Sequence, residues 1–222
     1  MNRGRGVVTG LLLLVLPACG LLFREAPEDD PNAVPGPNDV GARGELVTGG
    51  EAPDLIPSGA GRLSHSQISI VLQRGDLRML VTPLDEGIIR TAAPDTWQRL
   101  NALAESYRTT AHLRPGADAS DALFLVALHA ETRSATFEPA DVALTSQGVR
   151  HLPLDIQGLT PGWSRNRVDP RELEMAIYAF SSSLDPADGL ELEYQEVRSR
   201  DWERRLPAIL SEQARLMGRG GG

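Results

Sequence analysis

The chain has 222 residues and a formal net charge of −8 at neutral pH. Its basic residues are all arginine and form no dense cluster, so it lacks the usual means of neutralising nucleic-acid phosphates. The single cysteine, Cys19, excludes an internal disulfide and a thiolate metal centre. We therefore expect one domain of ordinary size, with no nucleic-acid partner.

The first twenty residues have the features of an export signal. Two arginines precede the apolar run 7–16, the usual order in a secretory leader. The sequence Leu16-Pro17-Ala18-Cys19 then resembles the lipobox of bacterial lipoproteins. That resemblance implies cleavage of the signal peptide, residues 1–18, and acylation of Cys19, which would attach the chain to a membrane through lipid.

Two alternatives to this anchor remain open, an uncleaved signal anchor and plain secretion. The uncharged run 7–23 has seventeen residues, the lower limit for a membrane span, and Pro17 would interrupt its helix. Gly20, directly after Cys19, matches the sorting pattern that implies outer-membrane delivery in bacterial lipoproteins. We expect an extracytoplasmic, lipid-anchored protein of the cell envelope, on the periplasmic face of the outer membrane or on the cell surface.

Residues 19–61 have the composition of a tether. The stretch from Arg24 to Gly61 holds six prolines, seven glycines and an acidic patch, and its apolar residues recur at neither helical nor strand spacing. We interpret 19–61 as a lipidated cysteine followed by a flexible tether with a span of roughly 35 Å. The alternative is a segment that folds on a partner.

Residues 62–222 show the short alternating patterns of β-strands. The runs 67–72 and 77–81 flank Arg74-Gly75-Asp76, and the runs 141–145 and 149–156 flank Ser146-Gln147-Gly148, which predicts two hairpins. Ile88-Ile89 is strand-like, and the almost wholly apolar run 122–128 predicts a central strand buried on both faces. The runs 173–180 and 190–197 alternate, with their carboxylates expected on the outer face.

Two helices are expected among these strands. Pro94 suits a first helical position, and Trp97, Leu100 and Tyr107 then fall on one stripe. A second helix follows residue 199 or 201, with Pro207 either in its first turn or at a kink.

Together these patterns predict a mainly β domain over 62–222. About seven strands with turns every ten residues or so indicate an antiparallel sandwich, with one inserted helix and a C-terminal helix. This predicted arrangement of strands and turns resembles the immunoglobulin-like domains of bacterial envelope proteins. No named family is indicated for the domain.

The sequence gives no strong signal for chemistry. The four histidines lack metal-ligand spacing, and no nucleophile motif or phosphate-binding loop occurs. We assign no catalytic residue, no metal ligand and no cofactor, and we expect the protein not to be an enzyme.

The loop around Trp163 is the one candidate for recognition. Trp163, Arg165 and Arg167 follow Gly162 in a long connection, and tryptophan and arginine often anchor interfaces. The alternative is that Trp163 folds back as a plug over the end of the sandwich.

The expected function is a non-catalytic module that binds an envelope protein or supports assembly. The alternatives are a carrier of a small ligand or metal ion, and an envelope hydrolase that uses an acidic pair such as Asp85 with Glu131. A deep apolar cavity would favour the carrier, and an exposed apolar patch would favour the module.

Overall fold

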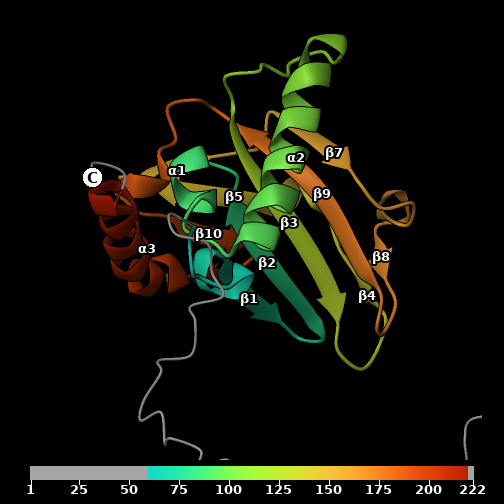
Figure 1. Ribbon diagram of the computed structural model, residues 1–222. Coiled ribbons are helices and arrows are strands. Elements are labelled where there is room, and N and C mark those ends of the chain that lie inside the picture. Colours follow the sequence, from blue (N-terminus) through green and yellow to red (C-terminus); the bar gives the residue numbers. More distant parts are fainter. Residues whose placement is uncertain (1–59, 220–222) are drawn as a thin grey trace, which may run out of the picture. The chain divides into compact units, whose positions relative to one another are not determined.

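The computed structural model describes residues 60–219, which fold into antiparallel sheets with helices beside them (Figure 1). Within these residues there are eleven strands, arranged as sheets of five, four and two strands. The prediction of a mainly β domain with a C-terminal helix is confirmed. The expected number of about seven strands was too low, because two predicted strands are each divided in two and the two short strands of the smallest sheet were not expected.

The five-stranded sheet has the order β1-β2-β3-β9-β7, and all of its neighbouring strands are antiparallel. Its strands are β1 (Ile70–Arg74), β2 (Leu77–Pro83), β3 (Ala122–Ala130), β9 (Leu173–Phe180) and β7 (Asp155–Gly158). The central strand β3 is buried along almost its whole length, as its apolar sequence predicts.

The four-stranded sheet has the order β11-β10-β5-β6. Its strands are β11 (Val197–Ser199), β10 (Glu191–Tyr194), β5 (Val142–Ser146) and β6 (Val149–His151), while β4 (Ala135–Thr136) pairs with β8 (Arg167–Val168). β11 lies beside the edge strand β1, where the Ser199 hydroxyl donates a hydrogen bond to the Val71 carbonyl at 2.7 Å. This contact joins the edges of the two larger sheets.

Both predicted hairpins are confirmed, and their turn residues explain them. Arg74 pairs with Leu77 across a two-residue turn that begins with Gly75 at φ 57°. In the β5–β6 hairpin, Gln147 and Gly148 both have positive φ, as in the type I′ turns that suit twisted strands.

The two faces of the five-stranded sheet are covered differently. One face carries Phe124 and Tyr178, which belong to the same buried cluster as Leu144 and Leu192 of the four-stranded sheet. The opposite face is covered by the predicted helix α2 (Pro94–Thr110), which Figure 1 shows running across the strands. There the Tyr107 hydroxyl donates to Asp155 on β7 at 2.8 Å.

The strand expected at Ile88-Ile89 was wrong, because this pair belongs to the short helix α1 (Glu86–Ile89). Asp85 precedes the helix and its carboxylate accepts a hydrogen bond from the Ile88 amide at 3.1 Å. This side-chain cap satisfies one of the free amide groups at a helix start. Two consecutive branched residues show neither the strand period nor the helix period. The capping residue Asp85 was therefore better evidence for a helix than the isoleucines were for a strand.

Two runs predicted as single strands are interrupted. The run 149–156 is divided into β6 and β7, which lie in different sheets, with Pro153 between them. Proline has no amide hydrogen to give to a strand ladder, so it is expected at such a break. The run 190–197 turns at Gln195, which has φ 53°, and continues as β11. The expected outward position of the carboxylates is wrong for Glu174, which is buried.

The C-terminal helix is α3 (Asp201–Arg219), with Pro207 inside it. Trp202 and Ile209 are fully buried, so this helix packs firmly through its first half. Short 3₁₀ segments, η1 (His65–Ile68), η2 (Ala111–Leu113), η3 (Pro139–Asp141), η4 (Trp163–Arg165) and η5 (Pro186–Asp188), connect the other elements. None of the helices within residues 60–219 combines the length and apolar character needed to cross a bilayer.

Candidate functional site

The predicted recognition loop places its tryptophan in the core. Trp163 begins η4 and is only 7% exposed. Its ring centroid lies 4.8 Å from that of Phe137 and 6.1 Å from that of Tyr178, the latter in an edge-to-face arrangement. Aromatic pairs at these distances stabilise a core beyond their buried area. The indole therefore acts as a plug at this position, the alternative that the sequence left open.

The two arginines of the same loop are engaged with carboxylates. Nη2 of Arg165 lies 3.5 Å from both Glu172 and the buried Glu174, and Arg167 pairs with Asp169 at 2.9 Å. Hydrogen bonds from Ser134 and then Arg167 lower the pKa of the Asp169 carboxyl. The structure thus places Trp163 and Arg165 on η4 and Arg167 at the start of β8, and of the three only the arginine side chains are accessible. Cys19 lies outside the described residues.

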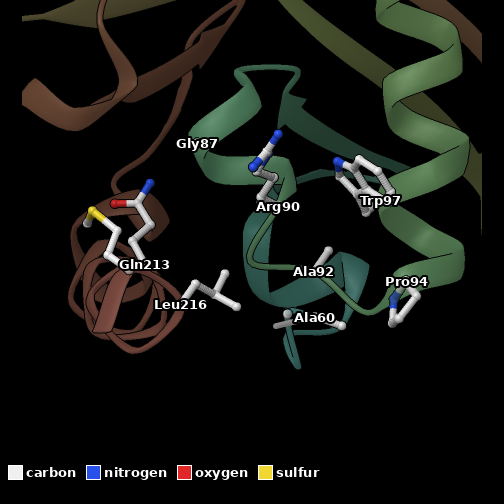
Figure 2. A pocket seen from close by; sticks show the side chains of 10 residues that line it. Ala60, Gly87, Arg90, Ala92, Pro94, Trp97, Gln213 and Leu216 are labelled. Atoms are coloured by element: carbon white, nitrogen blue, oxygen red, sulfur yellow. The ribbon is translucent and has the colours of Figure 1, made fainter. Parts of the chain in front are cut away.

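A second region of the surface is hollowed. Between α1, α2 and α3 lies a cavity of about 730 Å³, which we call the α-groove (Figure 2). Its lining is mostly apolar and comprises Ala60, Gly61, Gly87, Arg90, Ala92, Pro94, Trp97, Gln213, Leu216 and Met217. This volume lies in the range of about 300–1,000 Å³ typical of ligand pockets.

The chain enters the described domain along the wall of the α-groove. Arg215 donates to the Ala60 carbonyl at 2.7 Å, and the Arg62 amide donates to Glu212 at 2.9 Å. Arg215 and Glu212 both lie on α3, so the segment at residues 60–62 is fixed against that helix. Gly61 is required here, because a Cβ atom would overlap the backbone carbonyl groups of Arg90 and Thr91.

Apolar side chains at the α-groove remain open to solvent. Met217 is 74% exposed near the end of α3, and Leu216 beside it is half-buried. Trp97, half-buried on α2, forms part of the opposite wall, and no described residue accepts a hydrogen bond from its buried Nε1. Arg90, the one charged residue among the described residues of the lining, pairs with Glu86 at 2.8 Å, and both side chains are well exposed. Such a surface pair is weak and exchanges partners easily.

A histidine with two hydroxyl groups forms the nearest approach to a nucleophilic cluster. His65 Nε2 lies 2.9 Å from the Thr82 hydroxyl, which lies 2.7 Å from that of Ser69. Burial, followed by the charge of Arg99, lowers the pKa of His65. The other ring nitrogen faces Arg99 at 3.4 Å, where a nucleophilic triad has a carboxylate, and both hydroxyls are fully buried. We interpret the cluster as structural.

A second polar cluster joins α2 to the sheet. Asp155 accepts hydrogen bonds from Tyr107 at 2.8 Å and from Arg114 at 2.9 Å, and the Arg114 guanidinium lies 4.3 Å from the Tyr107 ring centroid. Burial, reinforced by the hydrogen bond to Asp155, raises the pKa of Tyr107 to about 12. The Tyr107 hydroxyl and Nε of Arg114 both donate to Asp155, which suits a fixed joint between elements, although no described residue accepts from Nη2 of Arg114.

The acidic pair suggested for hydrolysis is widely separated. Asp85 follows Pro83, which pairs with Phe124 at one end of β3, whereas Glu131 follows Ala130 at the other end. Six strand residues at about 3.3 Å each place the two acids roughly 20 Å apart. Within residues 60–219, no three histidine, cysteine or acidic side chains are close enough to hold a metal ion.

Comparison with known proteins gave no match to a family model, to a curated protein or to a solved structure. The sequence reasoning also missed the α-groove. Leu216 and Met217, near the end of α3, add to the apolar residues of that helix beyond what one buried stripe needs. That excess was the available signal for an unfilled surface.

Proposed function

We propose that this chain is a lipid-anchored protein of the bacterial cell envelope whose domain binds an apolar segment of a partner protein in the α-groove. Anchoring through Cys19 and export of the domain rest on the leader and its lipobox. We also propose that the five- and four-stranded sheets are the layers of a sandwich. Their apolar faces contribute to one buried cluster, which supports this description. Kinship with immunoglobulin-like domains stays a prediction.

One observation carries the binding proposal: apolar side chains surround a cavity that they do not fill. Proteins rarely leave contiguous apolar surface open unless it is used for binding. The lining combines aliphatic residues and an aromatic wall with one cation at the rim, Arg90. An extended peptide with apolar side chains and a nearby carboxylate matches that chemistry.

The anchoring proposal is tested by metabolic labelling with a fatty acid. The native chain should carry the label and lose its leader, whereas Cys19→Ser should stay unlabelled and retain its leader, because acylation precedes cleavage in the lipoprotein class that this leader resembles. Labelling or leader cleavage in Cys19→Ser equal to that of the native chain would contradict the anchor, as would full-length unacylated protein in the cytosol.

The binding proposal is tested with a photoreactive amino acid in place of Met217. Light should produce an adduct in cells, and mass spectrometry should locate it on an apolar segment of an envelope protein. Leu216→Arg should abolish the adduct by placing a charge in the α-groove. Leu210→Arg is the matched control, because Leu210 is 46% exposed on the same helix and lies outside the lining. Equal loss in both variants would overturn the proposal.

A second candidate, carriage of a small apolar ligand, is favoured by the cavity volume alone. Native mass spectrometry of the protein purified from cells separates the two candidates. A bound small molecule that Leu216→Arg removes would favour the carrier.

A further inference from the structure

We propose that residues Asp54 to Pro57 of the chain itself occupy the α-groove in the free protein, so that a partner must displace them. The proposal rests on the function proposed above and adds regulation to the same site. These residues lie outside the described part of the chain, and their place is inferred from where that part begins.

The start of the described chain is itself part of the α-groove. Ala60 and Gly61 line the cavity, and the Ala60 carbonyl is held by Arg215. Two further backbone hydrogen bonds, from Leu63 to the Thr91 carbonyl and from Ala93 to the Leu63 carbonyl, fix the direction of entry. The preceding residues must therefore leave from the wall of the cavity.

The nearest apolar side chains upstream are Leu55 and Ile56. Ile56 precedes Ala60 by four residues, a reach of at most about 14 Å, so both side chains can return into the cavity. A proline disfavours helical backbone at the residue before it, so the sequence Ile56-Pro57 should lower the entropy lost on docking. A short linker of this kind also gives a local concentration on the order of millimolar, so a weak site is still occupied.

Charge favours the same occupant. Asp54 directly precedes the apolar pair, and Glu51 lies three residues before it. Among residues 60–219 the ion-pair partner of Arg90 is Glu86, and both side chains are exposed, so Arg90 can turn to an incoming carboxylate at little cost. The same segment thus offers apolar residues for the cavity and an acid for its rim.

Trp97 provides the readout. The chain has three tryptophans, and Trp163 and Trp202 are buried, so quenching by acrylamide reports mainly the half-buried Trp97. The full chain is placed in phosphatidylcholine vesicles. Acrylamide quenching is then compared between two double variants, Leu55→Ser/Ile56→Ser and the control Leu46→Ser/Val47→Ser. The control pair is equally apolar but lies nine residues farther from the domain.

We expect the first pair of substitutions to raise the quenching constant about twofold or more, and the control pair to leave it unchanged. A synthetic peptide of residues 50–59 should then protect Trp97 of the first variant from acrylamide again. It is added at a few millimolar, roughly the local concentration of the tethered segment. Unchanged quenching in the first variant, an equal rise in both variants, or a peptide without effect would overturn the proposal.

The two proposals fail separately. If quenching rises but no partner adduct forms at position 217, self-docking stands and partner binding is wrong. If the adduct forms while quenching stays unchanged, partner binding stands and self-docking is wrong. If both hold, removing Leu55 and Ile56 should increase the adduct severalfold, because a larger fraction of the protein has an open groove.

Discussion

Trp163 and Trp97 lie on opposite sides of the five-stranded sheet and have contrasting surroundings. Trp163 sits in a loop yet is enclosed by Phe137 and Tyr178, whereas Trp97 belongs to a regular helix and borders an open cavity. A loop position therefore does not make a tryptophan available, and a helical stripe does not bury one. The burial of a tryptophan depends on whether neighbouring segments supply enough side chains to enclose its ring.

The largest expected difference between these regions is in stability. Trp163→Ala should lower the free energy of unfolding by about 3–5 kcal/mol, because it empties a closed aromatic cluster. Trp97→Ala should lower it by only about 1–2 kcal/mol, since the ring is half-buried. Urea unfolding followed by circular dichroism measures both. Equal losses would mean that the α-groove is as closed as the core.

Two glycines test the same difference between the closed Trp163 region and the open α-groove region. A Cβ atom at Gly162 would overlap the buried Glu174 carboxylate and the Arg165 guanidinium. We expect Gly162→Ala to cost about 1–3 kcal/mol through overpacking. Gly218→Ala is the control, because no atom within 4 Å opposes a Cβ there, and alanine should raise the helix stability slightly. Thermal unfolding of the two variants should shift in opposite directions.

The next effect concerns the two ends of α2. Tyr107, near its C-terminal end, is tied to Asp155, while Trp97 near its start has no described hydrogen-bond partner at Nε1. Tyr107→Phe should cost about 1 kcal/mol, the usual net value of one hydrogen bond. Amide hydrogen exchange should then speed up at the C-terminal turns of α2. Faster exchange confined to the first turn would contradict this view of the helix.

Much of the fold could be predicted because its signals are local. Gly75 and Gly148 mark turns, the run 122–128 marks a doubly covered strand, and Pro94 begins a helix that packs by its stripe. The division of strands between sheets depended on contacts far apart in sequence, so Pro153 was visible but the sheet change was not.

The candidate site was harder to predict for the same reason. Its lining comes from Ala60, α1, the start of α2 and the end of α3, which meet only in the folded chain. Trp163 was noticed for its residue type, but its burial depends on Phe137 and Tyr178, which no spacing rule connects to it.

The smallest expected effect is a pH dependence on the α-groove side. Hydrogen bonds from Arg215 lower the pKa of the Glu212 carboxyl, which also accepts from the Arg62 amide. A lowered folded-state pKa stabilises the protein above the ordinary value of about 4.3. That contribution is lost as the pH falls through the lowered pKa.

Glu212→Gln should therefore reduce stability modestly at pH 7 and have less effect at pH 3. Unfolding at the two pH values measures the difference. A penalty that is larger at pH 3 would contradict the assigned sign.

The most direct test of the account compares the two regions in cells. A photoreactive amino acid is placed at Met217 beside the α-groove in one chain, and in another at Arg167, where β8 begins directly after the Trp163 loop. We predict an adduct with an envelope protein from position 217 that Leu216→Arg abolishes, and no adduct from position 167. An adduct from position 167 alone would contradict the α-groove as the binding site and return that role to the loop.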